Sequence, residues 1–323
     1  MDDEAYRTAV SDFYVSLAAS QTDEARFAFN KMNEVATAFP EEAAAWANLG
    51  VMAMRQGNFD LAEERFGQAR AEAPENSTVL FLSGIFESRR GNVTAAIKYL
   101  RDAQEADPQN YQIEYALIGA LEREDDEANA DEIVQRMSDL YRELPQNQAV
   151  IFETARIAAK EQQSELLSDA IQSLTSYRDR WPSGASDLVQ VVDEAAKNGR
   201  YADLGFELTF LRNAVEPTSA FQADLRQIQL EPNQVGFLID QFIALPQPEF
   251  RASEPDMDLS FSQFEESRLP DESAFVKQAT LLEDRPPFSI YADQGNLVID
   301  ENVSLPMPVD IGADRLSPRS EER

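Results

Sequence analysis

The sequence predicts an all-α protein built of repeated helical hairpins, followed by a shorter segment that contains β-strands. Three observations support this prediction. Matching residue types recur in two adjacent units that begin at Ala43 and Ser77, so the period is 34 residues. Apolar residues with helical spacing continue on both sides of these units. From Pro246 onward, prolines become frequent and the helical spacing ends.

The two central units match at eight positions. In the first unit these positions hold Trp46, Leu49, Gly50, Gly57, Ala62, Phe66, Ala69 and Pro74. In the second unit they hold Leu80, Ser83, Gly84, Gly91, Ala96, Leu100, Ala103 and Pro108. The small residues allow two antiparallel helices to approach closely, the large apolar residues fill the space between them, and the proline ends the second helix. Each unit is therefore expected to be a pair of helices.

Weaker units flank the central pair. Pro40 sets the phase of an upstream unit, residues 111–147 form a longer downstream unit, and a fifth unit begins at Gln148. A solenoid also needs a cap, because an exposed terminal apolar face aggregates. The expected domains are about five repeats in residues 1–180, a helical continuation and cap in residues 181–245, and a Pro-rich extended or β segment with a disordered tail in residues 246–323.

Two short patterns lie in the C-terminal third of the chain. Val235, Leu238, Ile239 and Phe242 have the spacing of one helical face and predict a last helix before Pro246. Alternating apolar residues in 288–291 and in 296–299, on either side of a turn that contains Gly295, predict a β-hairpin or two edge strands.

The residue counts exclude several classes of function. The 323 residues include no His and no Cys. The chain therefore has no imidazole base, no Ser-His-Asp triad, no thiolate nucleophile and no zinc site with His or Cys ligands. Neither of the common glycine-rich phosphate-binding motifs occurs, and acidic pairs arise by chance among 59 acidic residues. We therefore expect no enzyme activity, no cofactor and no metal.

The charge is strongly acidic. With 28 basic and 59 acidic residues, the formal net charge is −31, which argues against binding nucleic acid or an anionic membrane surface. Scarce Lys together with abundant acid indicates a halophilic source, because repulsion between charges is screened within roughly 3 Å at 1 M salt. The alternative is an ordinary acidic protein with basic partners. No apolar run approaches the ~20 residues that span a bilayer, so we expect no membrane insertion.

The eight shared positions resemble the tetratricopeptide repeat. This resemblance implies a right-handed helical-hairpin solenoid whose first helices line a concave groove, and it implies a protein or peptide as the partner. A wider resemblance is carried by four short runs. These are Ala44–Gly50, Glu87–Gly91, Ala158–Lys160 and Phe210–Asn213.

These four runs are similar to the repeat-containing N-terminal region of bacterial proteins with FG-GAP/VCBS-type propeller and ASPIC/UnbV domains. This second resemblance covers about residues 5–265. It implies an exported or periplasmic protein whose propeller follows Arg323. Without this resemblance, the cytoplasm is the expected compartment.

The repeat geometry places two rows of side chains in the groove. Position 5 of successive units holds Phe13, Ala47, Phe81, Tyr115 and Phe152, and position 13 holds Gln21, Arg55, Arg89, Arg123 and Lys160. Arg156 stands at position 9 of the fifth unit. Arg side chains bind carboxylates and aromatic rings add apolar contact, so this groove suits a carboxylate-bearing peptide. The candidate site residues are Phe13, Arg55, Phe81, Arg89, Tyr115, Arg123, Phe152, Arg156 and Lys160.

Each row also has a structural explanation. A cation near a helix C-terminus offsets the helix dipole, and the aromatic residues fit packing against the next repeat equally well. The leading hypothesis is a non-catalytic scaffold that binds a peptide or protein segment in its groove. The alternative is a structural N-terminal arm that packs on a downstream propeller of its own chain. The sequence leaves open whether the chain's own C-terminal segment fills the groove.

Overall fold

The computed structural model describes residues 3–22, 24–124, 126–230, 237–243, 290–293 and 296–299. The chain divides into two units, one that extends to Glu249 and one that begins at Phe250. The two units are described separately.

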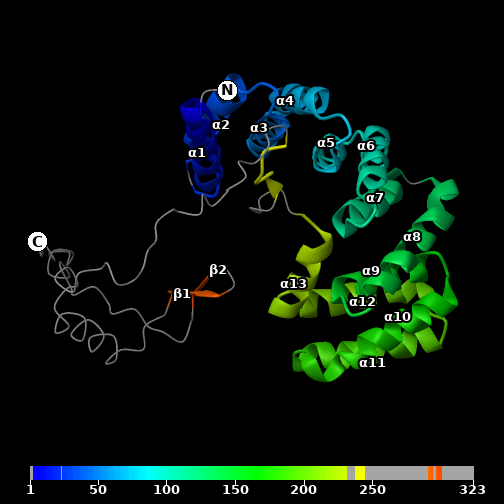
Figure 1. The fold of residues 1–323 in the computed structure, drawn as a ribbon. Coiled ribbons are helices and arrows are strands. Elements are labelled where there is room, and N and C mark those ends of the chain that lie inside the picture. The colour runs from blue at the N-terminus through cyan, green and yellow to red at the C-terminus, as the bar shows by residue number, and fades with distance from the viewer. Residues whose placement is uncertain are drawn as a thin grey trace, which may run out of the picture. The chain divides into compact units, whose positions relative to one another are not determined.

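Five helical hairpins follow one another around an arc in the first unit (Figure 1). The pairs are α1 (Asp3–Ala19) with α2 (Ala25–Ala38), α3 (Ala43–Arg55) with α4 (Phe59–Glu72), α5 (Ser77–Arg90) with α6 (Val93–Ala106), α7 (Tyr111–Glu124) with α8 (Ala130–Glu143), and α9 (Gln148–Lys160) with α10 (Ser164–Ser176). The predicted all-α, tetratricopeptide-like solenoid is therefore confirmed. None of the helices in the described residues is long and apolar enough to cross a membrane.

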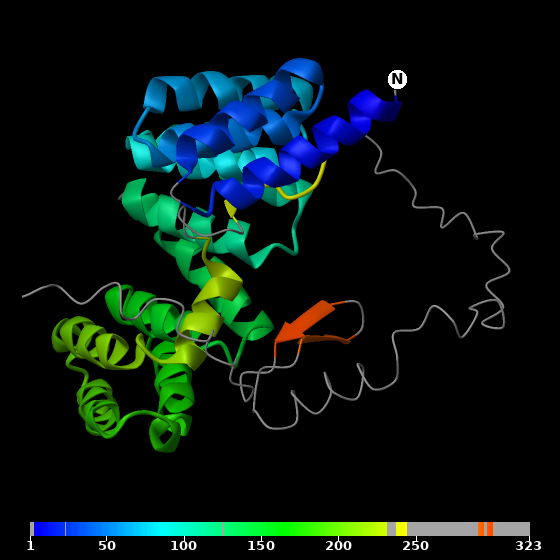
Figure 2. The ribbon, with the colours of Figure 1, turned by 90° about the vertical axis from the view of Figure 1, so that its left-hand side faces the viewer.

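Later helices continue the stack and then turn back. Helices α11 (Ser183–Lys197) and α12 (Tyr201–Val215) form a sixth pair. Helix α13 (Ser219–Ile228) leaves the stack and contacts α7 and α9, the first helices of their hairpins (Figures 1 and 2). Two short 3-10 helices, η1 (Glu127–Asn129) and η2 (Arg178–Arg180), lie before α8 and before α11.

Glycine and asparagine set the turns inside and between the central hairpins. Gly57 and Gly91 have φ angles of 74° and 80°, a left-handed conformation that glycine adopts at little cost. The side chain of Asn58 accepts a hydrogen bond from the main-chain N–H of Leu61 (3.3 Å) at the start of α4. A glycine that ends one helix and an asparagine that caps the next thus explain the pair Gly57-Asn58. The side chain of Asn92 instead donates back to Glu87 of α5.

Small residues lie where the two helices of a hairpin meet. A Cβ atom on Gly84 would lie 2.7 Å from Cγ of Leu100, and one on Gly50 would lie 3.0 Å from the ring of Phe66. Both large residues are fully buried. The close approach expected from the sequence is therefore present in both central hairpins.

Residues 237–243 return to the first hairpins. The side chains of Phe237, Leu238, Ile239 and Phe242 are buried in the same apolar cluster as residues of α1, α2 and α3. These residues form no α-helix, although their spacing predicts one, because the main-chain groups of Ile239 bond to a side chain of α3 instead. Val235 lies outside the described residues.

The second unit contains a β-hairpin among its described residues. Strand β1 (Ile290–Asp293) pairs in antiparallel register with β2 (Asn296–Ile299), so that Ile290 lies opposite Ile299. The pairing lies where alternation in the sequence predicts it. Residues 288–289 and the predicted tail lie outside the described residues.

Candidate functional site

The first helices of the hairpins, α1, α3, α5, α7 and α9, carry the candidate site residues. Apart from Arg55, these residues fall into three sections of the groove. The first section contains Phe13 together with two polar residues outside the predicted set, Glu42 and Asn48. The middle section contains Phe81, Arg89, Tyr115 and Arg123. The last section contains Phe152, Arg156 and Lys160.

Residues 237–243 cover the first section. The ring of Phe13 is fully buried and stacks on Phe242, with 4.7 Å between the ring centres. The side-chain amide of Asn48 donates to the carbonyl oxygen of Ile239 and accepts from its N–H, both at 2.7 Å. Oε1 of Glu42 accepts from the N–H of Ile243 at 2.8 Å. Asn48 and Glu42 thus bind main-chain groups of residues that are 191 and 201 positions away in sequence.

Helices from the end of the solenoid cover the last section. Phe152 is buried between Trp181 and Phe221, with 5.8 Å between ring centres in each case. The carboxylate of Asp224 in α13 accepts from both the main-chain N–H and the side-chain amide of Gln148, each at 2.9 Å. The aromatic row therefore packs against the chain's own helices at this position.

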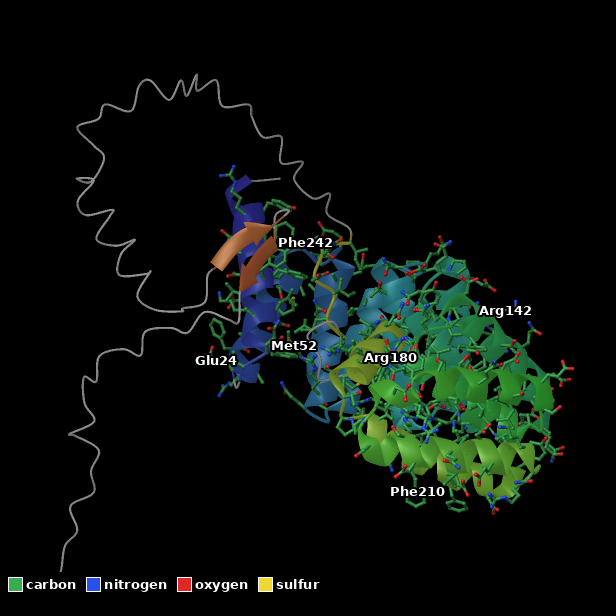
Figure 3. The ribbon with its side chains drawn as sticks, turned by 90° about the horizontal axis from the view of Figure 1, so that it is seen from below. Glu24, Met52, Arg142, Arg180, Phe210 and Phe242 are labelled. Carbon is green, nitrogen blue, oxygen red and sulfur yellow. The ribbon has the colours of Figure 1, made fainter. Side chains whose placement is uncertain are left out.

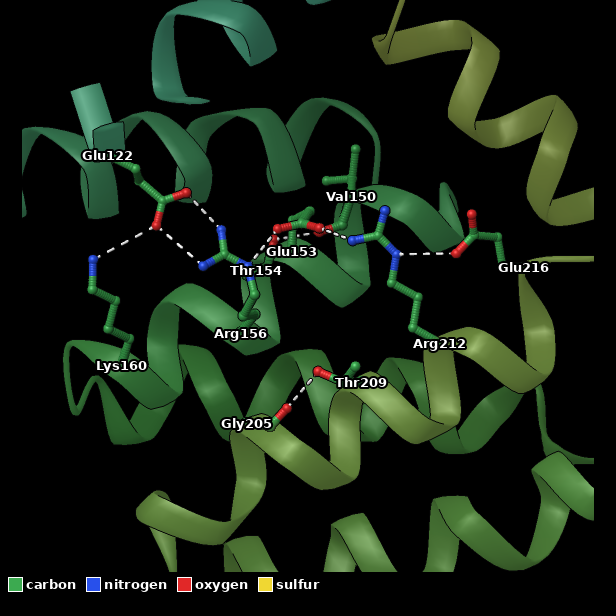
Figure 4. A network of polar contacts seen from close by, with 10 residues as sticks. All are labelled: Glu122, Val150, Glu153, Thr154, Arg156, Lys160, Gly205, Thr209, Arg212 and Glu216. Carbon is green, nitrogen blue, oxygen red and sulfur yellow. Dashed lines mark hydrogen bonds and ion pairs between the residues drawn. The ribbon is translucent and has the colours of Figure 1, made fainter. Parts of the chain in front are cut away.

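Carboxylates from α7 and α9 pair with the cations of the last section (Figure 4). The Arg156 guanidinium donates to both oxygens of Glu122, at 3.1 and 2.6 Å, and to Glu153 at 2.6 Å. The ammonium of Lys160 lies 3.7 Å from Glu122, and Arg212 of α12 pairs with Glu153. Burial by itself lowers the pKa of Arg156, but the hydrogen bonds to Glu122 and the charge of Glu153 raise it above its ordinary value.

The middle section forms a hollow of about 250 Å³ between α5, α7 and the residues that follow α13. Phe81, Arg89, Tyr115 and Arg123 all line it. Both Arg side chains are exposed, and Arg123 donates to the hydroxyl of Ser88. Within the described part of the chain, neither Arg89 nor Arg123 forms an ion pair.

Tyr115, one of the residues that line the hollow, keeps a neutral hydroxyl. Burial, together with the charge of Glu153, raises the pKa of Tyr115 well above its ordinary value of 10.0. Arg55 lies on α3, outside the hollow, and burial lowers its pKa below the ordinary value for arginine. The sequence thus brings four of its nine candidate residues into one open section.

Sequence reasoning did not identify Glu42 and Asn48. Both side chains are fully buried among the small and apolar residues at the start of α3. A buried polar side chain needs hydrogen-bond partners, so a Glu and an Asn next to the Ala-rich run 43–47 were the signal available in the sequence. Their partners lie far along the chain and could not be named from the repeat pattern.

Comparison with known proteins supports the repeat assignment. Residues 17–63 and 52–111 match the family model for the tetratricopeptide repeat, so this part of the chain contains such repeats. None of the curated proteins is a significant match. These findings do not show the resemblance to FG-GAP/VCBS and ASPIC/UnbV proteins.

Solved structures share the fold at low sequence identity. A structure reported in a functional characterization of pilF from Pseudomonas aeruginosa is 16% identical and has a TM-score of 0.51, and the match covers 70% of this chain and 100% of that one. PilW, described as a widely conserved type IV pilus biogenesis factor, is 17% identical with a TM-score of 0.48 and the same coverage. YrrB, described as a TPR protein with an unusual peptide-binding site, is 15% identical with a TM-score of 0.43, over 51% of this chain and 84% of that one.

Proposed function

We propose that this chain is a non-catalytic scaffold that holds a carboxylate-bearing segment of another protein in the middle section of its groove. The observation that carries the proposal is the hollow in which two exposed guanidinium groups, Arg89 and Arg123, lie beside Phe81 and Tyr115. The tetratricopeptide fold is in general a protein-binding scaffold. In the other two sections of this groove, the chain's own residues pack on Phe13 and Phe152, and its carboxylates pair with the cations of the last section.

The chemistry of the middle section favours a carboxylate. A guanidinium group binds a carboxylate through two parallel hydrogen bonds, and such charge-assisted bonds are about twice as strong as neutral ones. The half-buried ring of Tyr115 offers apolar contact to neighbouring side chains of the ligand, whereas Phe81 is buried and packs in the core. The net charge of −31 opposes an acidic ligand at long range, but salt screens this repulsion beyond roughly 8 Å at physiological ionic strength. Contacts inside the hollow therefore decide the affinity.

Charge reversal tests this proposal. The probe is a fluorescent ten-residue peptide with two glutamates that flank a leucine, compared with the same peptide carrying glutamines instead. We expect the chain to bind the glutamate peptide more tightly, and we expect Arg89→Glu with Arg123→Glu to weaken that binding at least tenfold, because two charge-assisted contacts become repulsive. Fluorescence anisotropy measures the affinity.

A second double variant provides the matched control. Arg26→Glu with Arg142→Glu changes the net charge by the same amount at exposed positions on α2 and α8, and we expect it to leave peptide binding unchanged. Circular dichroism checks that helix content is kept in both double variants. Equal losses of affinity in the two double variants would mean that net charge, and not the hollow, attracts the peptide.

The alternative, an arm that packs on a propeller of its own chain, rests on the wider sequence resemblance alone. It differs from the scaffold in its partner, because the covered surface would belong to the same polypeptide. Sequencing the coding region past Arg323 tests it, since a propeller domain must then follow.

A further inference from the structure

The first section of the groove binds main chain, and it does so with buried polar side chains. Asn48 uses its amide oxygen and its amide nitrogen on one residue, Ile239, and Glu42 accepts from the N–H of Ile243. Both side chains are fully buried with this segment in place. Glu42 also accepts from the N–H of Ala44 at the start of α3, so Asn48 is the side chain that depends most on hydrogen-bond partners in the segment that fills this section. These hydrogen bonds require an N–H and a carbonyl group on one residue of the occupant and an N–H on a second residue. They place no constraint on the side chains of the occupant.

Apolar contacts add a second requirement. Phe237, Leu238, Ile239 and Phe242 are buried, whereas Asp240 and Gln241 are exposed. Phe242 stacks on Phe13 and lies 6.1 Å from the ring of Tyr6. Figure 3 shows Phe242 among the first hairpins, whereas Phe210 projects from the surface of α12. The occupant therefore has three consecutive apolar residues, two polar ones and then an aromatic one.

We propose that the first section is a binding site for a segment of another protein with this pattern, and that residues 237–243 are its built-in competitor. The contacts that hold these residues are non-covalent and use main-chain groups that any non-proline segment offers. A partner segment with the same pattern can replace each of them. This site is separate from the middle section, so it is tested independently of the proposed function.

A peptide competition experiment on the full chain tests the proposal. The probe is a fluorescent peptide with the sequence of residues 236–245, Gly-Phe-Leu-Ile-Asp-Gln-Phe-Ile-Ala-Leu. A tethered segment competes at an effective concentration on the order of millimolar, so we expect the wild-type chain to bind the peptide weakly. Phe242→Ala weakens the tethered segment and leaves the groove intact, and we expect it to bind the peptide at least tenfold more tightly.

Matched variants separate the site from general effects. Phe206→Ala removes a ring that is 74% exposed on α12 and should leave the affinity of the peptide at the wild-type value. Asn48→Ala combined with Phe242→Ala should abolish the gain. A peptide with proline in place of Ile239 should also fail to bind, because proline has no N–H to donate. Arg89→Glu with Arg123→Glu should have no effect, and this distinguishes the first section from the middle one.

A second measurement follows the release of residues 237–243 in a chain that keeps the contacts of Phe242, Asn48 and Glu42. The chain has no cysteine, so Asp240→Cys, at an exposed position, accepts a single fluorophore. We expect excess unlabelled peptide to lower the anisotropy of this fluorophore as residues 237–243 leave the groove. Constant anisotropy at saturating peptide, or equal affinity of the peptide for the wild type and Phe242→Ala, would overturn the proposal. A dimer that exchanges residues 237–243, detected by light scattering, would also overturn it, since the occupant would then be a second copy.

Discussion

A single glycine decides how closely the two helices of the third hairpin approach each other. A Cβ atom on Gly84 would lie 2.7 Å from Cγ of Leu100 and 3.4 Å from the carbonyl oxygen of Ala96. Leu100 is fully buried and Ala96 belongs to the same core, so the neighbours have little room to move. The same reasoning explains why the sequence pattern pairs a small residue on α5 with a large one on α6.

We expect Gly84→Ala to lower the free energy of unfolding by about 1–2 kcal/mol, because overpacking outweighs the gain in helix propensity. Urea denaturation followed by circular dichroism measures the change. Gly205→Ala is the matched control, since a Cβ atom on Gly205, within α12, meets nothing within 4 Å. That substitution should stabilise the chain by up to ~1 kcal/mol. A Gly84→Ala variant as stable as Gly205→Ala would show that α5 and α6 can separate at no cost.

At the scale of elements, an ion-pair cluster joins three helices of the third and fourth hairpins. Glu132 of α8 accepts from Arg101 of α6 and from Arg136 of its own helix, both at 2.7 Å. Arg136 also donates to both oxygens of Glu114 in α7, at 3.0 Å. The hydrogen bond from Arg101 is the main reason why the pKa of Glu132 lies below its ordinary value of 4.5.

This pKa shift makes the contribution of Glu132 depend on pH. A carboxyl group with a lowered pKa in the folded state stabilises the fold above its unfolded pKa and loses that contribution as the pH falls through the folded value. We expect Glu132→Gln to be less stable than the wild type at pH 6, by under ~1 kcal/mol because the pair is partly exposed. The difference should vanish well below pH 4.5.

Urea midpoints between pH 3 and pH 7 measure this effect. Glu143→Gln changes the exposed glutamate that ends the same helix and should show no comparable difference at any pH. A constant difference between Glu132→Gln and the wild type across this range would mean that packing, and not charge, is lost.

The helix pairs of the repeat were predictable, whereas the covering of the groove was not. A 34-residue period reflects contacts between helices that are adjacent along the chain. It therefore predicts α3 to α6, and the less regular units on either side predict the flanking helix pairs. Asn48 and Ile239 are 191 residues apart, and a local pattern carries no information about such a contact. The apolar spacing of residues 238–242 therefore predicts a helix, while the structure uses the same side chains to fill the groove.

The repeat also predicts the positions of the candidate site residues but not the contacts that cover or pair them. Arg89 and Arg123 remain open in the middle section, and their positions followed from the repeat alone. Arg156 and Lys160 share Glu122, a pairing between neighbouring hairpins that the repeat positions of the cations do not reveal. Phe13 and Phe152 are covered by residues that follow the fifth hairpin. The 34-residue period does not extend to these residues, so it could not predict that they pack in the groove.

At the scale of the whole molecule, the net charge of −31 acts against the compact state. The mutual repulsion of the acidic side chains weakens as salt shortens the screening length from about 10 Å at 0.1 M to about 3 Å at 1 M. A halophilic origin, which the composition predicts, requires that the fold depend on this screening.

We expect the chain to lose helical circular dichroism when it is transferred from 2 M to 0.05 M sodium chloride at pH 7, and to regain it when salt is restored. Salt also strengthens apolar burial, so a control must separate the two effects. At a pH near the isoelectric point of about 4.2, the net charge is close to zero and only the apolar effect remains. The thermal midpoint should therefore rise much less with salt at that pH than at pH 7. Full helicity at 0.05 M salt and pH 7 would instead identify an ordinary acidic protein, whose packed hairpins tolerate the repulsion without screening.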